Sequence, residues 1–318
     1  MAPNISIDDR NVSFFELRDL GLIVGLTVLG LVAWVCPERY WSVVTRSVAA
    51  CVCPILRVFG KGQADLMRAI LKSDANRAEA ERTEEANFAG RLEEQLQYLR
   101  EYRPGGWRPR LRTTGIEHLE RALGDGAGCI LWIDPLLYSP LVVKKALHDA
   151  GYPAVHLSRY YHGPSNSEFG RQFINVIVTH CEDRYLKDRL RMKPGTELAQ
   201  VRLMSRLLRE NGLVSIACSH HGSRIRNLPI LGGTLPCASG APALAIEMDT
   251  PLLPVAVGKT PDGGFEVSID AALPAERSQG PRAAVDRLLG VYAERLESAV
   301  RVNPAAFAGW RYMRVSAA

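Results

Sequence analysis

The sequence predicts an α/β protein with a mixed, largely parallel sheet flanked by helices, and with an N-terminal membrane-anchoring helix. Two observations predict this fold class. From residue 113 onward, apolar strand-like runs alternate with helical segments, which is the pattern of a parallel sheet covered by helices. Residues 20–36 contain no charged side chain and come close to the length that a membrane-spanning helix needs.

The composition is that of an ordinary globular chain. Of its 318 residues, 47% are hydrophobic and 23% are charged, a balance that excludes a disordered protein. The formal charge of +5 suits an anionic membrane, an acidic carrier protein or a phosphorylated substrate. It is too small to require nucleic acid, and no nucleic-acid-binding motif accompanies it. The seven cysteines form no C-x-x-C pair, so neither a disulfide framework nor a metal site is indicated.

The first predicted region, residues 1–42, holds an N-terminal segment and a transmembrane helix. Trp34, Tyr40 and Trp41 lie where a helix over residues 20–36 would meet the membrane interface. Acidic residues before the apolar run, and the missing small-residue cleavage site, argue against a secretory signal peptide. Four basic residues follow the run: Arg39, Arg46, Arg57 and Lys61. By the positive-inside rule, the C-terminal body therefore faces the cytoplasm.

The second predicted region, residues 43–112, is interfacial and helical. Residues 43–59 form an apolar segment that we expect to lie in the membrane interface and to break near Pro54. Residues 62–102 are rich in Glu, Arg, Ala and Leu and predict a helix with a solvated face. Residues 103–112 contain two prolines, two glycines, four arginines and a tryptophan, which suits a loop that meets lipid headgroups. A plain linker is the alternative.

The third predicted region, residues 113–318, is an α/β body. The helices expected there cover residues 115–123, the stretch that ends at residue 150, residues 196–210 and residues 239–248. The expected strands cover residues 128–133, 152–159, 173–180, 213–219, 251–258 and 264–270, the last two as a hairpin. In a sheet of this kind, ligands bind at the carboxyl ends of the strands.

Polar side chains gather at three of these strand ends. They are Asp134 after the first strand, His156, Arg159 and His162 at the second, and His220, His221 and Arg224 after residues 213–219. Asp134 is a candidate for chemistry or, alternatively, the N-cap of the helix that Pro135 opens. The histidine doublet His220–His221 is a better catalytic candidate than a lone histidine, which is more often structural.

Three arginines are candidates for holding a substrate anion, because guanidinium groups suit phosphate or phosphopantetheine. They are Arg159, Arg224 and Arg226. The alternative is a basic surface that faces anionic lipid. His156 and His162 are further candidates for substrate contact, because they gather with Arg159 at the end of the same expected strand.

Several stretches together resemble the late acyltransferases of lipid A biosynthesis, the lauroyl and myristoyl transferases within the lysophospholipid acyltransferase superfamily. The stretches are GIEHLERALGDGAGCILWI, GYPAVHLSR, ENGLVSIACSHHGSRIRNLPILGG, ASGAPALAIEMDTPLLPVAVGKTPDGGFEVSID and NPAAFAGWRYM. The likeness spans nearly the whole chain and is most specific over residues 229–262. It implies a bacterial inner-membrane enzyme, single-pass or monotopic, whose catalytic domain faces the cytoplasm. It also implies transfer of a fatty acyl chain from acyl carrier protein or acyl-CoA to a glycolipid hydroxyl, with no tightly bound cofactor and no metal.

The chain departs from this family at the catalytic signature, which is a histidine followed five residues later by a carboxylate. The matching positions here are Asp134 or Pro135, and then Ser139 or Pro140. We favour the hypothesis that Asp134 orients a relocated base, His220 or His221, because a base and its orienter are the usual pair for acyl transfer. The competing hypothesis is a catalytically inactive protein that binds lipid or scaffolds an envelope glycoconjugate complex.

Overall fold

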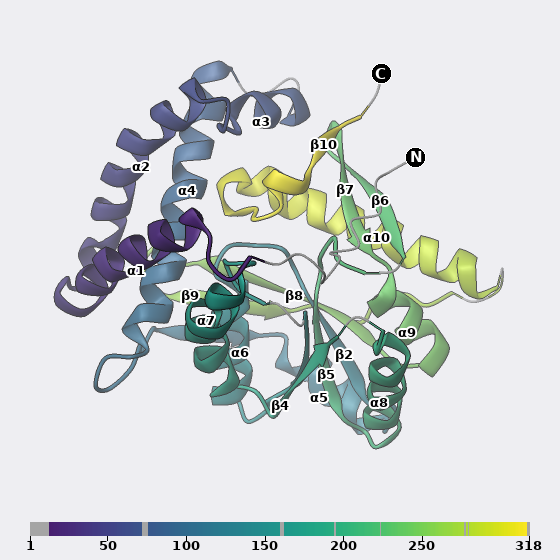
Figure 1. Ribbon diagram of the computed structural model, residues 1–318. Coiled ribbons are helices and arrows are strands. Elements are labelled where there is room, and N and C mark those ends of the chain that lie inside the picture. The colour runs from purple at the N-terminus through teal and green to yellow at the C-terminus, as the bar shows by residue number, and fades with distance from the viewer. Residues whose placement is uncertain are drawn as a thin grey trace.

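A seven-stranded sheet forms the centre of the protein. The computed structural model describes residues 13–71, 76–159, 162–193, 195–222, 224–276, 278 and 280–316. The strand order is β1-β9-β8-β2-β5-β3-β4 (Figure 1). The bounds are β1 (Leu111–Thr114), β2 (Cys129–Ile133), β3 (Val155–Arg159), β4 (Asp188–Met192), β5 (Leu213–Ala217), β8 (Leu252–Lys259) and β9 (Phe265–Ile269). The five strands from β8 to β4 are parallel, whereas β9 is antiparallel to β8 and parallel to β1, so the predicted mixed, largely parallel sheet is confirmed.

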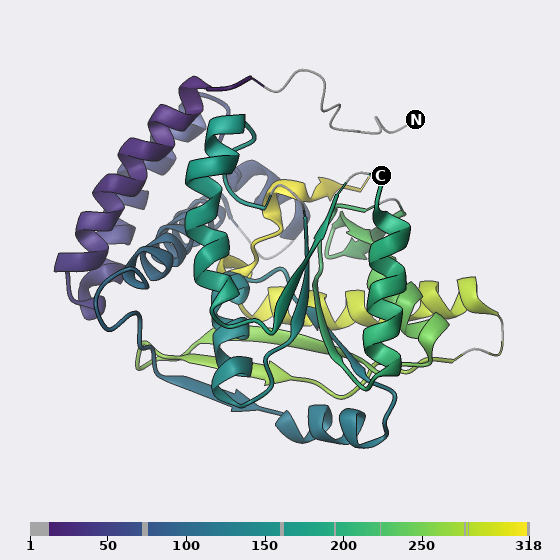
Figure 2. The same ribbon diagram turned by 60° about the horizontal axis from the view of Figure 1, so that its bottom comes forward.

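Helices cover both faces of this sheet. Those of the body are α5 (Ile116–Gly124), α6 (Ser139–Asp149), α7 (Asn175–Asp183), α8 (Glu197–Arg209), α9 (Gly240–Met248) and α10 (Pro281–Val302). Figure 2 shows α7 in teal and α8 in green on either side of the strands. A second, antiparallel sheet of β6 (Ile225–Ile230), β7 (Gly233–Ala238) and β10 (Arg314–Val315) packs against α10. The carboxyl ends of β2, β5 and β3 therefore lie side by side along one edge of the large sheet.

The core lies around β2, the central strand of the parallel part. All five of its residues are buried, as the uninterrupted apolar run CILWI predicts for a strand that is covered on both faces. The ring of Trp132 stacks on the ring of Tyr292 from α10, with centroids 3.8 Å apart. This contact holds the end of β2 against the longest helix of the body.

The N-terminal helices form a separate layer beside the body. α1 (Leu17–Val35) and α2 (Trp41–Val58) pack on the long helix α4 (Arg77–Arg100), and α3 (Ala64–Leu71) packs on α4 as well (Figure 1). The outer faces of α1 and α2 expose large apolar side chains: Leu17, Leu20, Val24, Val28, Leu31, Val35, Val43, Ile55 and Val58. By length and composition, both segments could cross a membrane. The apolar N-terminal helix expected from residues 20–36 is thus present.

The predicted strand over residues 173–180 is wrong. A π-helical turn, Gly170–Ile174, leads directly into α7. The run FINVIVTH is rich in β-branched residues and so favours a strand, but its inward-facing side chains Ile174, Val178 and Cys181 recur at helical spacing. In the large sheet the prediction missed both edge strands, β1 and β4, and it also missed the three strands of the small sheet. β4 has the polar sequence DRLRM, of which only Leu190 is buried.

Three expectations for the N-terminal half are corrected as well. α2 does not break at Pro54 but continues to Val58. The helix expected over residues 62–102 is divided into α3 and α4, and Asn76 caps α4 by accepting a hydrogen bond from the backbone N–H of Glu79 at 2.9 Å. Trp107, expected in a loop at the lipid headgroups, is buried, and its ring meets Phe265 edge-on at 5.7 Å.

Candidate active site at the strand ends

Asp134 lies directly after β2 and is fully buried, but its carboxylate is turned toward α10. Oδ1 accepts a hydrogen bond from the Tyr292 hydroxyl at 2.9 Å, and Oδ2 accepts one from Arg295 Nη1 at 2.6 Å. Burial raises the pKa of the Asp134 carboxyl, while Arg295 and Tyr292 oppose the rise. These contacts join the end of β2 to α10, so the geometry gives Asp134 a structural role.

These contacts match neither role that the sequence suggested for Asp134, the N-cap of the next helix or the orienter of a histidine base. α6 begins at Ser139 and its N-cap is Tyr138, so Asp134 does not cap the helix. Within the described part of the chain, the hydrogen-bond partners of its carboxylate come from α10 and include neither His220 nor His221. The expected Asp–His dyad is therefore not formed in this structure.

His156 and His162 lie in different surroundings. His156 is buried between β3 and β5, where its Nδ1 is 2.9 Å from Ser215 Oγ. Burial, and then the charge of Lys144, lower its pKa well below the ordinary value, so His156 is a neutral, buried residue in this structure. His162 is half-buried, and its Nε2 is 3.4 Å from Glu182 Oε1.

Arg226 lies in β6 of the small sheet, and Arg224 lies just before β6, where its carbonyl accepts a hydrogen bond from the Ser239 N–H at 3.0 Å. Both side chains are exposed. Arg226 Nε is 3.3 Å from Asp286 Oδ1 of α10, a pair in which both side chains are at least half exposed. This exposure supports the surface interpretation for these two arginines.

His220 and His221 follow β5 and are half-buried at the sheet edge. Their rings lie 3.6 Å apart, and the ring of His220 lies 3.7 Å from that of Tyr312. Burial, and then the charge of Arg159, lower the pKa to about 4 for His220 and to about 3 for His221. Both imidazoles are thus neutral at pH 7 and each carries one N–H donor. Arg311 adds to the positive field around them.

A carboxyl group from α4 completes this edge. Glu94 accepts a hydrogen bond from the backbone N–H of Tyr138, at the N-terminus of α6, and Arg91 and Arg311 lie near it. Burial raises the pKa of Glu94 to about 7, although the two arginines oppose the rise. Arg91 is one helical turn before Glu94, and it is fixed by hydrogen bonds to Asn87 Oδ1 at 3.0 Å and to the Ala308 carbonyl at 2.9 Å.

We define the strand-end cluster as Arg91, Glu94, Arg159, His220, His221, Arg311 and Tyr312. Arg311 lies near both the Glu94 carboxyl group and the two neutral imidazoles, while Arg91 lies near Glu94 and Arg159 lies near the imidazoles. This arrangement can hold an anion, stabilise a developing oxyanion and exchange one proton near pH 7. Among the described residues, no group of three or more His, Cys, Asp and Glu side chains could hold a metal ion.

Sequence reasoning found three members of the cluster, Arg159, His220 and His221, from their place at strand ends. It missed Arg311 and Tyr312, although both belong to the closing motif NPAAFAGWRYM that carried part of the resemblance. It also missed Arg91 and Glu94, because α4 is dense in charged residues and no spacing sets these two apart. No protein-family model and no curated protein matches the chain.

Proposed function

We propose that the chain is a membrane-bound acyltransferase that moves a fatty acyl chain from acyl carrier protein or acyl-CoA to a hydroxyl of a glycolipid or envelope glycoconjugate. The observation that carries the proposal is Glu94, whose carboxyl group has a pKa of about 7 and lies at a helix N-terminus among arginines. A general base works best when its pKa is near the operating pH. The resemblance to lipid A acyltransferases supports the same reaction type.

In the proposed reaction, Glu94 takes the proton from the acceptor hydroxyl while the hydroxyl oxygen attacks the thioester carbonyl carbon. The tetrahedral intermediate then breaks its carbon–sulfur bond, and the leaving thiolate takes the proton back from Glu94. His220 and His221 are weaker bases, because their pKa values lie near 4 and 3. Their role in the proposal is to donate N–H hydrogen bonds to the oxyanion, with Arg159 adding positive charge.

The position of α4 supports access of a lipid substrate to this cluster. One side of α4 packs against α1 and α2, whose outer faces are apolar, and the other side carries Glu94 toward α6. A helix with its side chains is about 10 Å thick, so the apolar layer and the proposed base are one helix apart. An acyl chain that leaves the membrane therefore has a short path to the cluster.

The contacts of α1 favour a monotopic protein over a single-pass one. Near its start, Asp19 Oδ1 accepts a hydrogen bond from Ser165 Oγ at 2.6 Å, and near its end Trp34 Nε1 donates to the Leu99 carbonyl at 3.1 Å. The 19 residues of α1 span about 28 Å, close to the hydrocarbon thickness of a bilayer. A helix held to one body at both ends lies along that body. We infer that α1 and α2 insert their outer faces into one leaflet, which the resemblance identifies as the cytoplasmic leaflet of the bacterial inner membrane.

Labelling of residue 13, which precedes α1, tests this topology. In a variant with Cys36 and Cys51 replaced by serine, Ser13→Cys should react with a membrane-impermeant maleimide in inverted vesicles and not in intact spheroplasts. The same pattern is expected of Ser298→Cys on α10, which reports the side of the body. A single membrane-spanning α1 would place residues 13 and 298 on opposite sides. Labelling of residue 13 from the side opposite to residue 298 would contradict the monotopic arrangement.

The activity itself is tested with purified protein and radiolabelled acyl donors. Acyl carrier protein and coenzyme A thioesters, offered with glycolipid acceptors in mixed micelles, should yield an acylated acceptor. Without acceptor, slow donor hydrolysis should remain, because water can take the place of the hydroxyl. The alternative, a catalytically inactive protein that binds lipid or scaffolds a complex, is supported by Asp134. Its carboxylate already accepts hydrogen bonds from Tyr292 and Arg295 of α10. Saturable lipid binding with neither transfer nor hydrolysis, over several donors and acceptors, would favour a scaffold.

A further inference from the structure

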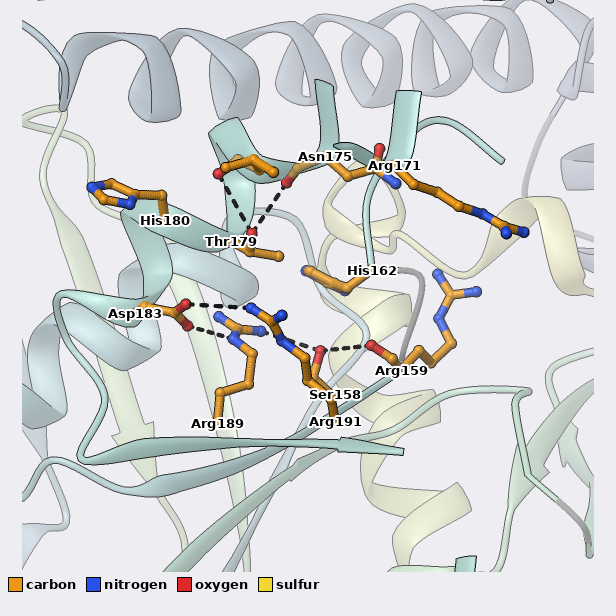
Figure 3. Close-up of a pocket in the computed structure, with 11 residues that line it drawn as sticks. Ser158, Arg159, His162, Arg171, Asn175, Thr179, His180, Asp183, Arg189 and Arg191 are labelled. Carbon is orange, nitrogen blue, oxygen red and sulfur yellow. Dashed lines mark hydrogen bonds and ion pairs between the residues drawn. The ribbon is translucent and has the colours of Figure 1, made fainter. Parts of the chain in front are cut away.

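A second polar site adjoins the strand-end cluster. A pocket of about 180 Å³ opens between the carboxyl ends of β3 and β4 and the helix α7 (Figure 3). Four arginines line it: Arg159, Arg171, Arg189 and Arg191. Asp183 is the acidic residue among the lining side chains. The pocket is therefore strongly basic.

The positive charge of Arg189 is paired with carboxylates of the protein itself. Its Nη2 donates to Glu182 Oε2 at 2.8 Å, its Nε donates to Asp183, and its Nη1 donates to Ser158 Oγ at 3.2 Å. Glu182 is fully buried and is also paired with Lys144 Nζ at 3.1 Å. These bonds make the back wall rigid, and they leave Arg189 little capacity for a ligand.

The other arginines are differently placed. Arg191 is half exposed, and its contact with Asp183 is long, at 3.9 Å. Among the described residues, no carboxylate forms an ion pair with Arg159. Figure 3 shows the side chains of Arg159 and Arg171 extending to the same side of the pocket. Besides Arg171, four described cations stand against two carboxylates here: Lys144, Arg159, Arg189 and Arg191 against Glu182 and Asp183. Among these six side chains, the positive charges exceed the negative ones by two.

The remaining wall is polar and fixed. The side-chain amide of Asn175 is held by Ser165, since its Oδ1 accepts from the Ser165 N–H at 2.9 Å and its Nδ2 donates to the Ser165 carbonyl at 2.8 Å. The hydroxyl of Thr179 lies between these groups and Asp183 in Figure 3. A preformed pocket of this kind binds an anion without first ordering its own side chains.

We infer that this pocket binds a phosphate group, as a monoester or a diester, of a phosphorylated substrate. Phosphate matches the site because its tetrahedral oxygens accept hydrogen bonds from guanidinium groups that approach from different directions. The binding of phosphate in this pocket does not depend on the proposed reaction. The identification of the phosphate-bearing ligand as the acyl acceptor or the acyl donor rests on the proposed function. Arg159 belongs to both sites, so a phosphate held here lies beside His220 and His221.

Two substrates of the proposed reaction can supply this phosphate. One is a phosphorylated glycolipid headgroup, and the other is the phosphodiester of a phosphopantetheine arm. The two are separated by kinetics: loss of arginine side chains should raise KM for the molecule whose phosphate the pocket holds, and it should leave KM for the other substrate nearly unchanged.

The direct test titrates inorganic phosphate into the full-length protein at constant ionic strength, with binding followed by calorimetry. Wild-type protein should bind phosphate saturably. The double variant Arg171→Gln/Arg191→Gln should bind it at least about tenfold more weakly, because charge-assisted hydrogen bonds carry that much affinity. The control is Arg301→Gln, which removes one positive charge from an exposed ion pair on α10 and should bind phosphate as the wild type does. Equal affinity in the double variant and the wild type, or no saturable binding in the wild type, would overturn the inference.

A second variant keeps the test decisive if the double variant does not fold. Val176 lines the pocket and is 45% exposed, so Val176→Glu places a carboxylate in the pocket without disturbing the core. It should abolish phosphate binding while the circular dichroism spectrum and the unfolding midpoint stay those of the wild type. A folded Val176→Glu protein that still binds phosphate would refute the site. If phosphate binds as expected and no acyl transfer is found, the pocket stands and the proposed reaction fails.

Discussion

Replacing Arg295 with methionine is expected to lower the free energy of unfolding by about 3 kcal/mol, the largest stability change that we predict for a single side chain. The substitution leaves the Asp134 carboxylate fully buried without its guanidinium partner. Burial by itself lowers the pKa of Arg295, but the carboxylates of Asp134 and Asp270 outweigh this effect and raise it, which shows how strongly the pair is coupled. Urea unfolding of the full-length protein in detergent, followed by fluorescence, measures the loss.

A double-mutant cycle isolates the pair from other effects. Asp134→Asn alone should cost less, because Arg295 keeps Asp270 and the asparagine can still accept the bond from Tyr292. With Asp134→Asn present, Arg295→Met should add little, since no buried charge is left unpaired. Arg301→Met, in an exposed pair one helical turn apart on α10, is the matched control and should change stability by less than about 0.5 kcal/mol. Additive effects in the cycle would show that the two side chains do not act as a unit.

The same experiment decides the role of Asp134. As an orienter of a catalytic histidine, it would affect turnover more than stability when changed to asparagine. As the link between β2 and α10, it should affect stability, while the activity per folded molecule stays close to that of the wild type. The contacts with Tyr292 and Arg295 favour the second result.

The fold was predictable where local sequence and burial agree. The run CILWI is apolar throughout because β2 is covered on both faces, and α9 is apolar because it packs against β2, β8 and α10. The prediction failed at the sheet edge. β4 has a polar sequence because an edge strand is half solvated, and α7 contains β-branched residues whose strand preference is outweighed by packing.

The candidate site was predictable only to the extent that it follows from topology. Parallel strands end at one edge, so Arg159, His220 and His221 could be grouped from the sequence. The partners of Asp134 could not be predicted from the sequence. Tyr292 and Arg295 come from a helix about 160 residues later, and no motif marks them. Glu94 could not be singled out either, because only the packing of α4 against α7 and against Tyr138, the residue before α6, distinguishes it from the other glutamates of its helix.

Replacing Glu94 with glutamine is expected to lower kcat for acyl transfer by about 10²-fold or more, the range for losing a positioned general base. The amide keeps the shape of the side chain but cannot take the proton of the acceptor hydroxyl. The wild-type rate should rise with pH and level off above about pH 7, because only the deprotonated carboxylate is a base. The variant should lose this pH dependence. Glu85→Gln, on the same helix but paired with Arg57, is the control that should keep both the rate and the profile.

Stability separates this catalytic effect from a folding defect. Burial raises the pKa of Glu94 above the ordinary carboxyl value, so the stability that its neutral form contributes is present at low pH and is lost as pH rises through about 7. Glutamine is neutral at every pH, and Glu94→Gln should therefore be at least as stable as the wild type at pH 8. A variant that is stable but inactive supports the base assignment. Full activity in a stable Glu94→Gln protein would remove Glu94 from the mechanism and return the search for the base to His220 and His221.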